Sequence, residues 1–172
     1  MIRHIFLSYN KSSGGESGFT LVELITVIAI MGVLLSIATI NFRHYRVKSG
    51  IENQTREMYA DINSARIDSI HTKKRHAVIL NTNSYALKNF TTNEPTTAGR
   101  TLVTRAIPNA ITKEGGTTYA NEMILFDIRG FTDFGTTLVV NPLGNEASQN
   151  CIVVSASRIN MGRVASDNTC QF

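Results

Sequence analysis

The chain has 172 residues, of which 42% are hydrophobic, and a formal net charge of +4 at pH 7. This length suits one domain and little more. Residues 41–76 hold eight Lys and Arg against four Asp and Glu, whereas residues 77–172 hold seven of each kind. A nucleic-acid-binding domain usually clusters cations that attract phosphate, so a neutral C-terminal part argues against that class.

The first 18 residues are polar, and we interpret them as a leader peptide. They include Arg3 and Lys11 and end in Ser and Gly residues typical of a flexible, accessible chain. An ordinary secretory signal is cleaved after its apolar stretch, but here the candidate cleavage site, Gly18, comes before one. Cleavage after Gly18 would make Phe19 the new N-terminus and would leave the whole apolar stretch in the mature protein.

Residues 19–40 form an apolar segment in which Glu23 is the only charged residue. The segment has about the 20 residues that a transmembrane helix needs, so it predicts a membrane anchor. A carboxylate within a span costs roughly 2.5 to 3.5 kcal/mol on insertion scales and usually marks a function with a partner. The partner of Glu23 would be the α-amine of Phe19, in the same chain or in a neighbouring copy. Alternatively, Glu23 lies among lipid headgroups, where a carboxylate costs little.

The sequence GFTLVELITVIAIMGVLLSIA, which begins at Gly18, resembles the class III signal of type IV pilins and type II secretion pseudopilins. In that family a prepilin peptidase cleaves after the glycine and methylates the new N-terminal residue, which implies these roles for Gly18 and Phe19. The family's glutamate, here Glu23, directs subunit addition to the filament. The resemblance also implies insertion in the bacterial inner membrane with a periplasmic head, and other major and minor pilins or pseudopilins as partners.

One feature departs from the pattern of major pilins. Those proteins commonly have a proline a little over twenty residues into the mature helix, where this chain has Ile40 and Asn41. The absence of that proline favours a minor pilin or a pseudopilin.

Residues 41–75 are predicted to continue the helix with an amphipathic pattern. Apolar or small side chains recur at steps of four and three, which brings them to one face of an α-helix. These residues are Val47, Ile51, Thr55, Met58, Ile62, Ala65 and Ser69. A single helix from about Phe19 to about His71 would have its first half in the membrane or a filament core and its second half on a head domain.

Residues 76–172 are predicted to form a β-rich head. The runs HAVILN and SYALKNF flank Thr82 and Asn83 and predict an antiparallel hairpin. Further apolar or β-branched runs are TLVTRAI, EMILFDI, TTLVVN, CIVVSAS and RINMGRV, separated by segments rich in turn-forming residues. A long helix followed by several strands predicts an α+β fold in which an antiparallel sheet packs on the apolar face of the helix.

Three segments of the head resemble the GspH/FimT group of minor pilins: DINSARIDSIHTKKRHAVILN, ILFDIRGF and IVVSASRINMGRV. The resemblance implies a pilin-like fold. It also implies one of three roles: membership of the tip complex in type II secretion, priming of pilus assembly, or DNA binding during uptake.

The DNA-binding members have a second arginine two positions after a C-terminal Gly-Arg pair. Here Arg163 completes such a pair, but Ala165 stands where the second arginine would be. Arg158 or Arg129 would be the substitute cation. The alternative is that Arg158 and Arg163 are solvated or contact another subunit, and we expect DNA binding to be the less favoured function.

Cys151 and Cys170 are the two cysteines of the chain. Export would bring them to an oxidising compartment, where a disulfide persists, and the loop that it closes would give roughly 3 kcal/mol of stability. Two buried free thiols are the alternative. Two cysteines without a nearby histidine fall short of the four ligands of a structural zinc site, so no metal and no cofactor is expected.

The sequence has no nucleophile elbow, no Gly-rich phosphate loop and no His-Glu-x-x-His helix, so we expect no enzyme. Asp127 and Asp133 flank a turn and are expected to bond its amides rather than to form an acid-base pair or a calcium site. His71 and His76 are expected to be surface residues. An anchored periplasmic protein unrelated to filaments, with Met1 retained, is a third alternative.

Overall fold

The computed structural model of the protein describes residues 18–91, 98–144 and 146–172, and at residues 38–41 it describes the backbone alone. Residues 1–17 of the predicted leader lie outside the described residues. The chain divides into two compact units, Met1–Asn41 and Phe42–Phe172.

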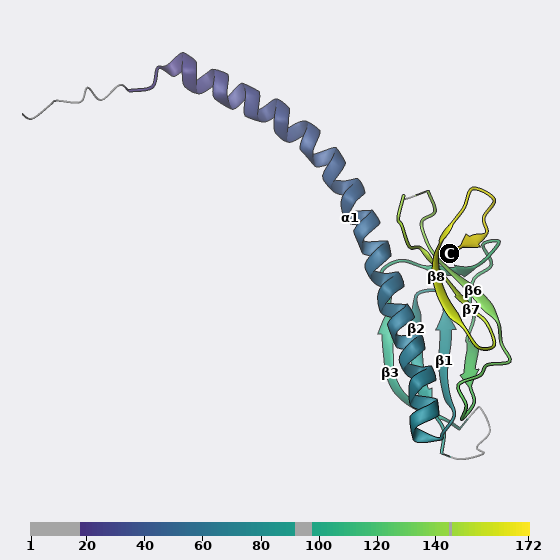
Figure 1. The fold of residues 1–172 in the computed structure, drawn as a ribbon. Coiled ribbons are helices and arrows are strands. Elements are labelled where there is room, and N and C mark those ends of the chain that lie inside the picture. Colours follow the sequence, from purple (N-terminus) through teal and green to yellow (C-terminus); the bar gives the residue numbers. More distant parts are fainter. Residues whose placement is uncertain (1–17, 92–97, 145) are drawn as a thin grey trace, which may run out of the picture. The chain divides into compact units, whose positions relative to one another are not determined.

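One long helix, α1, covers Leu21–Thr72 and belongs to both units (Figure 1). These bounds agree with the helix predicted from about Phe19 to about His71. Within the second unit, the strands begin four residues after the helix ends. The fold is α+β, as the sequence predicted.

The predicted apolar face of the helix is buried from Ile51 onward. Six of its seven residues are buried: Ile51, Thr55, Met58, Ile62, Ala65 and Ser69. The prediction was wrong at Val47, which is 41% exposed because it lies one turn before the first buried residue of the helix. The two polar members bond backbone carbonyls: the Thr55 hydroxyl donates to Ile51 at 2.8 Å and the Ser69 hydroxyl to Arg66 at 2.6 Å. Small hydroxyl residues can therefore pack in this face without an unpaired polar atom.

Among the described residues, the head has two antiparallel sheets, whereas the sequence predicted one. The four-stranded sheet has the order β3-β2-β1-β5, of which Figure 1 labels β3, β2 and β1. Its strands are β1 (His76–Asn81), β2 (Ser84–Asn89), β3 (Arg100–Ala106) and β5 (Glu122–Phe126). The hairpin of β1 and β2 was predicted correctly, because Asn81 pairs with Ser84 across the turn at Thr82 and Asn83.

The five-stranded sheet has the order β4-β6-β7-β8-β9. Its strands are β4 (Ile111–Lys113), β6 (Thr136–Val140), β7 (Cys151–Val154), β8 (Ile159–Val164) and β9 (Cys170–Gln171). Three of these strands were predicted. The other two, β4 and β9, have three and two residues, too few to give a period-2 pattern.

One hydrophobic core joins the helix and both sheets. It takes Ile51, Met58 and Ile62 from α1, Val78, Leu80, Ile124 and Phe126 from the first sheet, and Leu138, Val140, Ile152 and Val154 from the second. Tyr119, in the segment between β4 and β5, also belongs to it, and its hydroxyl bonds the Thr136 hydroxyl at 2.8 Å. An ion pair of 2.5 Å between Lys113 on β4 and Glu122 on β5 links the two sheets again.

His76 is buried, so its expected surface location was wrong. It opens β1, which lies between β2 and β5, and its side chain is within 3.2 Å of the Thr72 hydroxyl. Burial lowers the pKa of His76, while Asp68 acts in the opposite direction and Lys74 in the same one. His71, in the last turn of the helix, is exposed as expected.

Candidate functional site

The segment around the predicted cleavage site is exposed and lies directly before α1. Gly18, Phe19 and Thr20 are all exposed and precede the first helical residue, Leu21. The Phe19 side chain is 79% exposed. A peptidase would therefore meet the Gly18–Phe19 peptide bond in exposed, non-helical chain directly before a helix.

Thr20 caps this helix. Its hydroxyl accepts a hydrogen bond from the Glu23 amide at 3.2 Å, and its carbonyl accepts one from the Leu24 amide at 3.2 Å. Thr20 is thus the residue at the N-cap, and Glu23 is the third residue of the helix, the positions of a capping box. The cap was not predicted, although Thr-x-x-Glu before an apolar run is its sequence signal.

The position of Glu23 in the first turn also has an electrostatic consequence. The exposed amides of a helix N-terminus carry partial positive charge, which stabilises a nearby carboxylate by about 0.3 to 1 kcal/mol. This is smaller than the insertion cost of a carboxylate, so the helix end alone does not account for Glu23. A partner with a full positive charge therefore stays a prediction for Glu23, with a position among lipid headgroups as the alternative.

The helix after Glu23 has the composition of a membrane span. An 18-residue window of α1 reaches a mean hydropathy of 2.5, and its apolar side chains are exposed on all sides. Among its described side chains, the hydroxyls of Thr26 and Ser36 donate to the backbone carbonyls of Glu23 and Val33 at 2.9 and 2.7 Å. Because these hydroxyls have partners within the helix, they add little to the cost of placing it in lipid or against other apolar helices.

The candidate DNA-binding arginines do not form one cluster. Arg158 lies in the turn between β7 and β8, and Arg163 is the fifth residue of β8. At about 3.3 Å per residue, their Cα atoms are roughly 17 Å apart. Both are exposed, whereas Arg129 is engaged with Asp127, with 3.0 Å between guanidinium and carboxylate.

Asp127 organises the turn that follows β5. One of its carboxylate oxygens accepts hydrogen bonds from the amides of Arg129 and Phe131 at 2.8 and 2.9 Å. Partial burial opposes ionisation, but these bonds outweigh it and lower the pKa of Asp127. This confirms the structural interpretation of Asp127. Asp133 was also expected to bond turn amides. The Phe134 amide instead donates its hydrogen bond to the Thr132 hydroxyl, at 3.2 Å.

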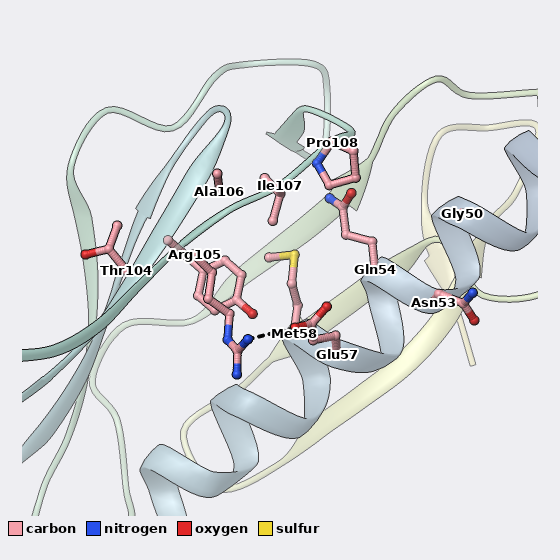
Figure 2. Close-up of a pocket in the computed structure, with 11 residues that line it drawn as sticks. Gly50, Asn53, Gln54, Glu57, Met58, Thr104, Arg105, Ala106, Ile107 and Pro108 are labelled. Atoms are coloured by element: carbon pink, nitrogen blue, oxygen red, sulfur yellow. Dashed lines mark ion pairs between the residues drawn. The ribbon is translucent and has the colours of Figure 1, made fainter.

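A pocket of about 430 Å³ lies between α1 and β3 (Figure 2). At one end, Arg105 points from β3 toward the helix, where its guanidinium lies 3.0 Å from Glu57 and 2.7 Å from Asp61. Asp61 also accepts a hydrogen bond of 2.6 Å from the Tyr85 hydroxyl, and burial together with this carboxylate raises the pKa of Tyr85.

At the other end of the pocket, Gln54 on the helix holds the segment after β3. Its side-chain amide donates to the Asn109 carbonyl at 2.7 Å and accepts from the Asn109 amide at 2.9 Å. Arg105 and Gln54 thus fasten β3 and the segment after it to the helix. Within residues 18–91, 98–144 and 146–172, no group of three or more His, Cys, Asp or Glu is placed to hold a metal ion.

Cys151 and Cys170 form a disulfide that joins β7 to the short strand β9, with 6.1 Å between their Cα atoms. Gly162, on the strand between them, pairs with Cys151. The disulfide thus fixes the C-terminus onto the five-stranded sheet.

Comparison with known proteins agrees with this arrangement. Residues 14–39 match the family model described as the prokaryotic N-terminal methylation motif. A curated relative, the type IV major alpha-pilin of Moraxella bovis, is 27% identical over 137 residues, which are 78% of this chain and 73% of that protein.

Solved structures of a minor pseudopilin share the fold. The crystal structure of the minor pseudopilin EpsH, from the type II secretion system of Vibrio cholerae, has a TM-score of 0.52 and 12% identity and covers 67% of this chain and 94% of that one. A second structure of EpsH has a TM-score of 0.50 and 10% identity, over 65% and 94% of the two chains. With an N-terminal methylation motif, an apolar N-terminal helix and the fold of a minor pseudopilin, this chain combines the N-terminal motif and the fold of type IV pilin-like proteins.

Proposed function

We propose that the protein is a minor subunit of a type IV pilus or a type II secretion pseudopilus, cleaved after Gly18 by a prepilin peptidase and methylated on Phe19. The observation that carries this proposal is the exposed Gly18–Phe19 peptide directly before a capped apolar helix with Glu23 in its first turn. The description of the matched motif, N-terminal methylation, supports the same processing. The minor rather than major role is supported by the likeness of the fold to that of EpsH.

Before assembly, the apolar part of α1 anchors the subunit in the bacterial inner membrane with its head in the periplasm. The high hydropathy of the helix supports the anchor. The Cys151–Cys170 disulfide supports a periplasmic head, because such bonds persist in oxidising compartments. In the filament, the same apolar surface packs against the helices of other pilins or pseudopilins.

Glu23 directs this assembly by pairing with a methylated α-amine. The amine of Phe19 in a neighbouring copy would supply the full positive charge that the helix end does not. This ion pair would be formed away from water, where charges attract strongly. The subunit would then prime or cap the filament, with its neutral head exposed beyond the helical core.

DNA binding is the less supported alternative. A phosphate backbone is bound by several cations that act together, and the separation of Arg158 from Arg163 does not favour joint contacts. A mobility-shift assay at low salt with the full chain in detergent should give no shifted DNA, and a shift that Arg158→Gln or Arg163→Gln removes would revive this function.

Two measurements test the proposed function. The intact mass of the membrane-extracted protein, under non-reducing conditions, should match residues 19–172 plus one methyl group and less two hydrogens. A mass that begins at Met1 would contradict it. In cells with the rest of the machine, Glu23→Ala should insert and be cleaved but should be absent from sheared filaments, whereas Ser36→Ala, in the same helix, should be incorporated. Equal incorporation of both variants would refute the role of Glu23.

A further inference from the structure

We propose that residues 42–48, a basic and aromatic belt after the apolar segment, bind the phosphate groups of anionic phospholipids at the membrane surface. The belt has the sequence Phe-Arg-His-Tyr-Arg-Val-Lys. The inference rests on the proposed membrane anchor but not on filament assembly. It assigns to the subunit a lipid site that holds it in the bilayer.

The length of the helix sets the depth of the belt. Residues 21–40 of α1 rise roughly 30 Å, at 1.5 Å per residue, which is the thickness of the hydrocarbon core. The headgroup layer on each side adds about 5 to 7 Å. Arg43 and Arg46, three and six residues beyond Ile40, follow at about 5 and 9 Å. Their guanidinium groups therefore reach the phosphates when the apolar segment spans the bilayer.

The belt is exposed in the second compact unit. Phe42 is 61% exposed and Tyr45 is 67% exposed, and the first buried residue of the helix is Ile51. In the part of the chain that the structure describes, no carboxylate lies within ion-pair distance of Arg43 or Arg46. The cation of Lys48 contributes, after the Ser148 hydrogen bonds, to the lowered pKa of Glu52. At least two cations are thus available to a ligand.

The charges surround the helix instead of lying on one face. At 100° per residue, Arg46 is about 60° from Arg43, and Lys48 is on roughly the opposite side from both. A helix that lies flat on a membrane has its cations on one face. A ring of cations with two aromatic side chains suits a helix that crosses the headgroup layer, where Tyr, Arg and Lys are enriched.

Membrane topology does not account for the belt. Lys and Arg are usually in excess on the cytoplasmic side of a span, but the proposed cytoplasmic leader has Arg3 and Lys11 against the three cations of the belt. Nor does a second copy of this chain offer a complement, because residues 77–172 are neutral. The anionic groups that lie at this depth are lipid phosphates, and each Lys or Arg near such a surface strengthens binding about fivefold.

The test is native mass spectrometry of the full processed chain in a neutral detergent, titrated with phosphatidylglycerol and with phosphatidylcholine. The wild type should retain more phosphatidylglycerol than phosphatidylcholine. The variant R43Q/R46Q/K48Q should bind phosphatidylglycerol roughly 25- to 125-fold more weakly, at about fivefold for each of two or three cations. The control K74Q/R158Q/R163Q loses the same charge from exposed positions beyond the end of α1 and should bind as the wild type does.

Equal retention of the two lipids by the wild type would overturn the proposal. So would an equal loss of phosphatidylglycerol binding in both triple variants. Displacement of the lipid by millimolar inorganic phosphate would indicate a general anion site and would also overturn it. If R43Q/R46Q/K48Q binds phosphatidylglycerol normally but is absent from filaments, the belt contacts other subunits and the lipid site is refuted while the proposed function stands. Glu23→Ala should bind phosphatidylglycerol normally. A failure of the assembly role of Glu23 can therefore be distinguished from a failure of the lipid site.

Discussion

Gly162 lies directly against the carbonyl oxygen of Gln171, with no space for a side chain between them. A Cβ at Gly162 would overlap this oxygen and would come within 3.2 Å of the Cys170 sulfur. Gly162 also accepts a hydrogen bond from the Asn150 amide at 3.0 Å through its carbonyl. In the Gly-Arg pair by which the sequence resembles the GspH/FimT group, the glycine is thus required by the packing of β9 on β8.

We expect Gly162→Ala to displace β9 and to lower the free energy of unfolding by about 1 to 3 kcal/mol, as overpacking does. Urea denaturation of the full chain, followed by circular dichroism, measures this. Gly135→Ala is the matched control, because a Cβ there would meet the Val154 carbonyl oxygen at an ordinary 3.5 Å. Equal stability of the two variants would contradict the close packing.

Removal of the disulfide should destabilise the head. We expect the double variant Cys151→Ala, Cys170→Ala to unfold with about 3 kcal/mol less free energy than the oxidised wild type, since the bond closes a loop across a sequence separation of 19. Adding a reductant should bring the wild type close to the variant and should leave the variant itself unchanged. A wild type whose denaturation midpoint does not respond to the reductant would contradict this prediction.

Burial of His76 should make the head less stable in acid. Because its pKa is lowered in the folded state from the ordinary value of 6.5, the unfolded chain binds the proton more tightly. The contribution of the neutral side chain is present above pH 6.5 and declines as the pH falls below it, by at most about 1.4 kcal/mol per pH unit. His76→Asn should flatten the stability profile between pH 7 and 5, whereas His71→Asn, at an exposed position, should not. The same slope in both variants would mean that other groups govern the acid sensitivity.

The two partners of Asp61 should contribute unequally. Tyr85 is 1% exposed, and its hydrogen bond to a carboxylate is worth roughly 1.5 to 3 kcal/mol. The guanidinium of Arg105 is half-exposed, and such ion pairs contribute about 0 to 1 kcal/mol. We therefore expect Tyr85→Phe to cost more stability than Arg105→Gln, and the cost of Arg105→Gln alone to shrink in 1 M salt. Tyr59→Phe controls for the loss of a hydroxyl, and a larger effect of Arg105→Gln at high salt would contradict the prediction.

The helix and most strands could be predicted because their signals are local. Apolar or small residues at steps of three and four from Ile51 to Ser69 predict a buried helix face. The runs HAVILN and SYALKNF, on either side of a short turn, predict two paired strands. The division into two sheets could not be predicted, because apolar runs indicate strands without their partners. His76 shows the same limit: it is buried because β1 lies between two other strands, which no local pattern reveals.

The candidate site was predicted in part for a similar reason. Gly18, Phe19 and Glu23 lie within six residues of one another, so their order alone made them candidates, and the Thr20 cap also has a local sequence signal. The relation between Arg158 and Arg163 depends on the turn at Arg158 and on the direction of β8, and only the structure gives it.

The Thr20 cap has a consequence for maturation. Cleavage after Gly18 would remove nothing that the helix end uses, because the capping hydroxyl and the amide that it bonds both lie on the mature side of the cut. Precursor and mature subunit would then share one helix start. The proposed cleavage would change only the group before the helix: a peptide bond and a polar leader before the cut, and a positively charged amine two residues from Leu21 after it.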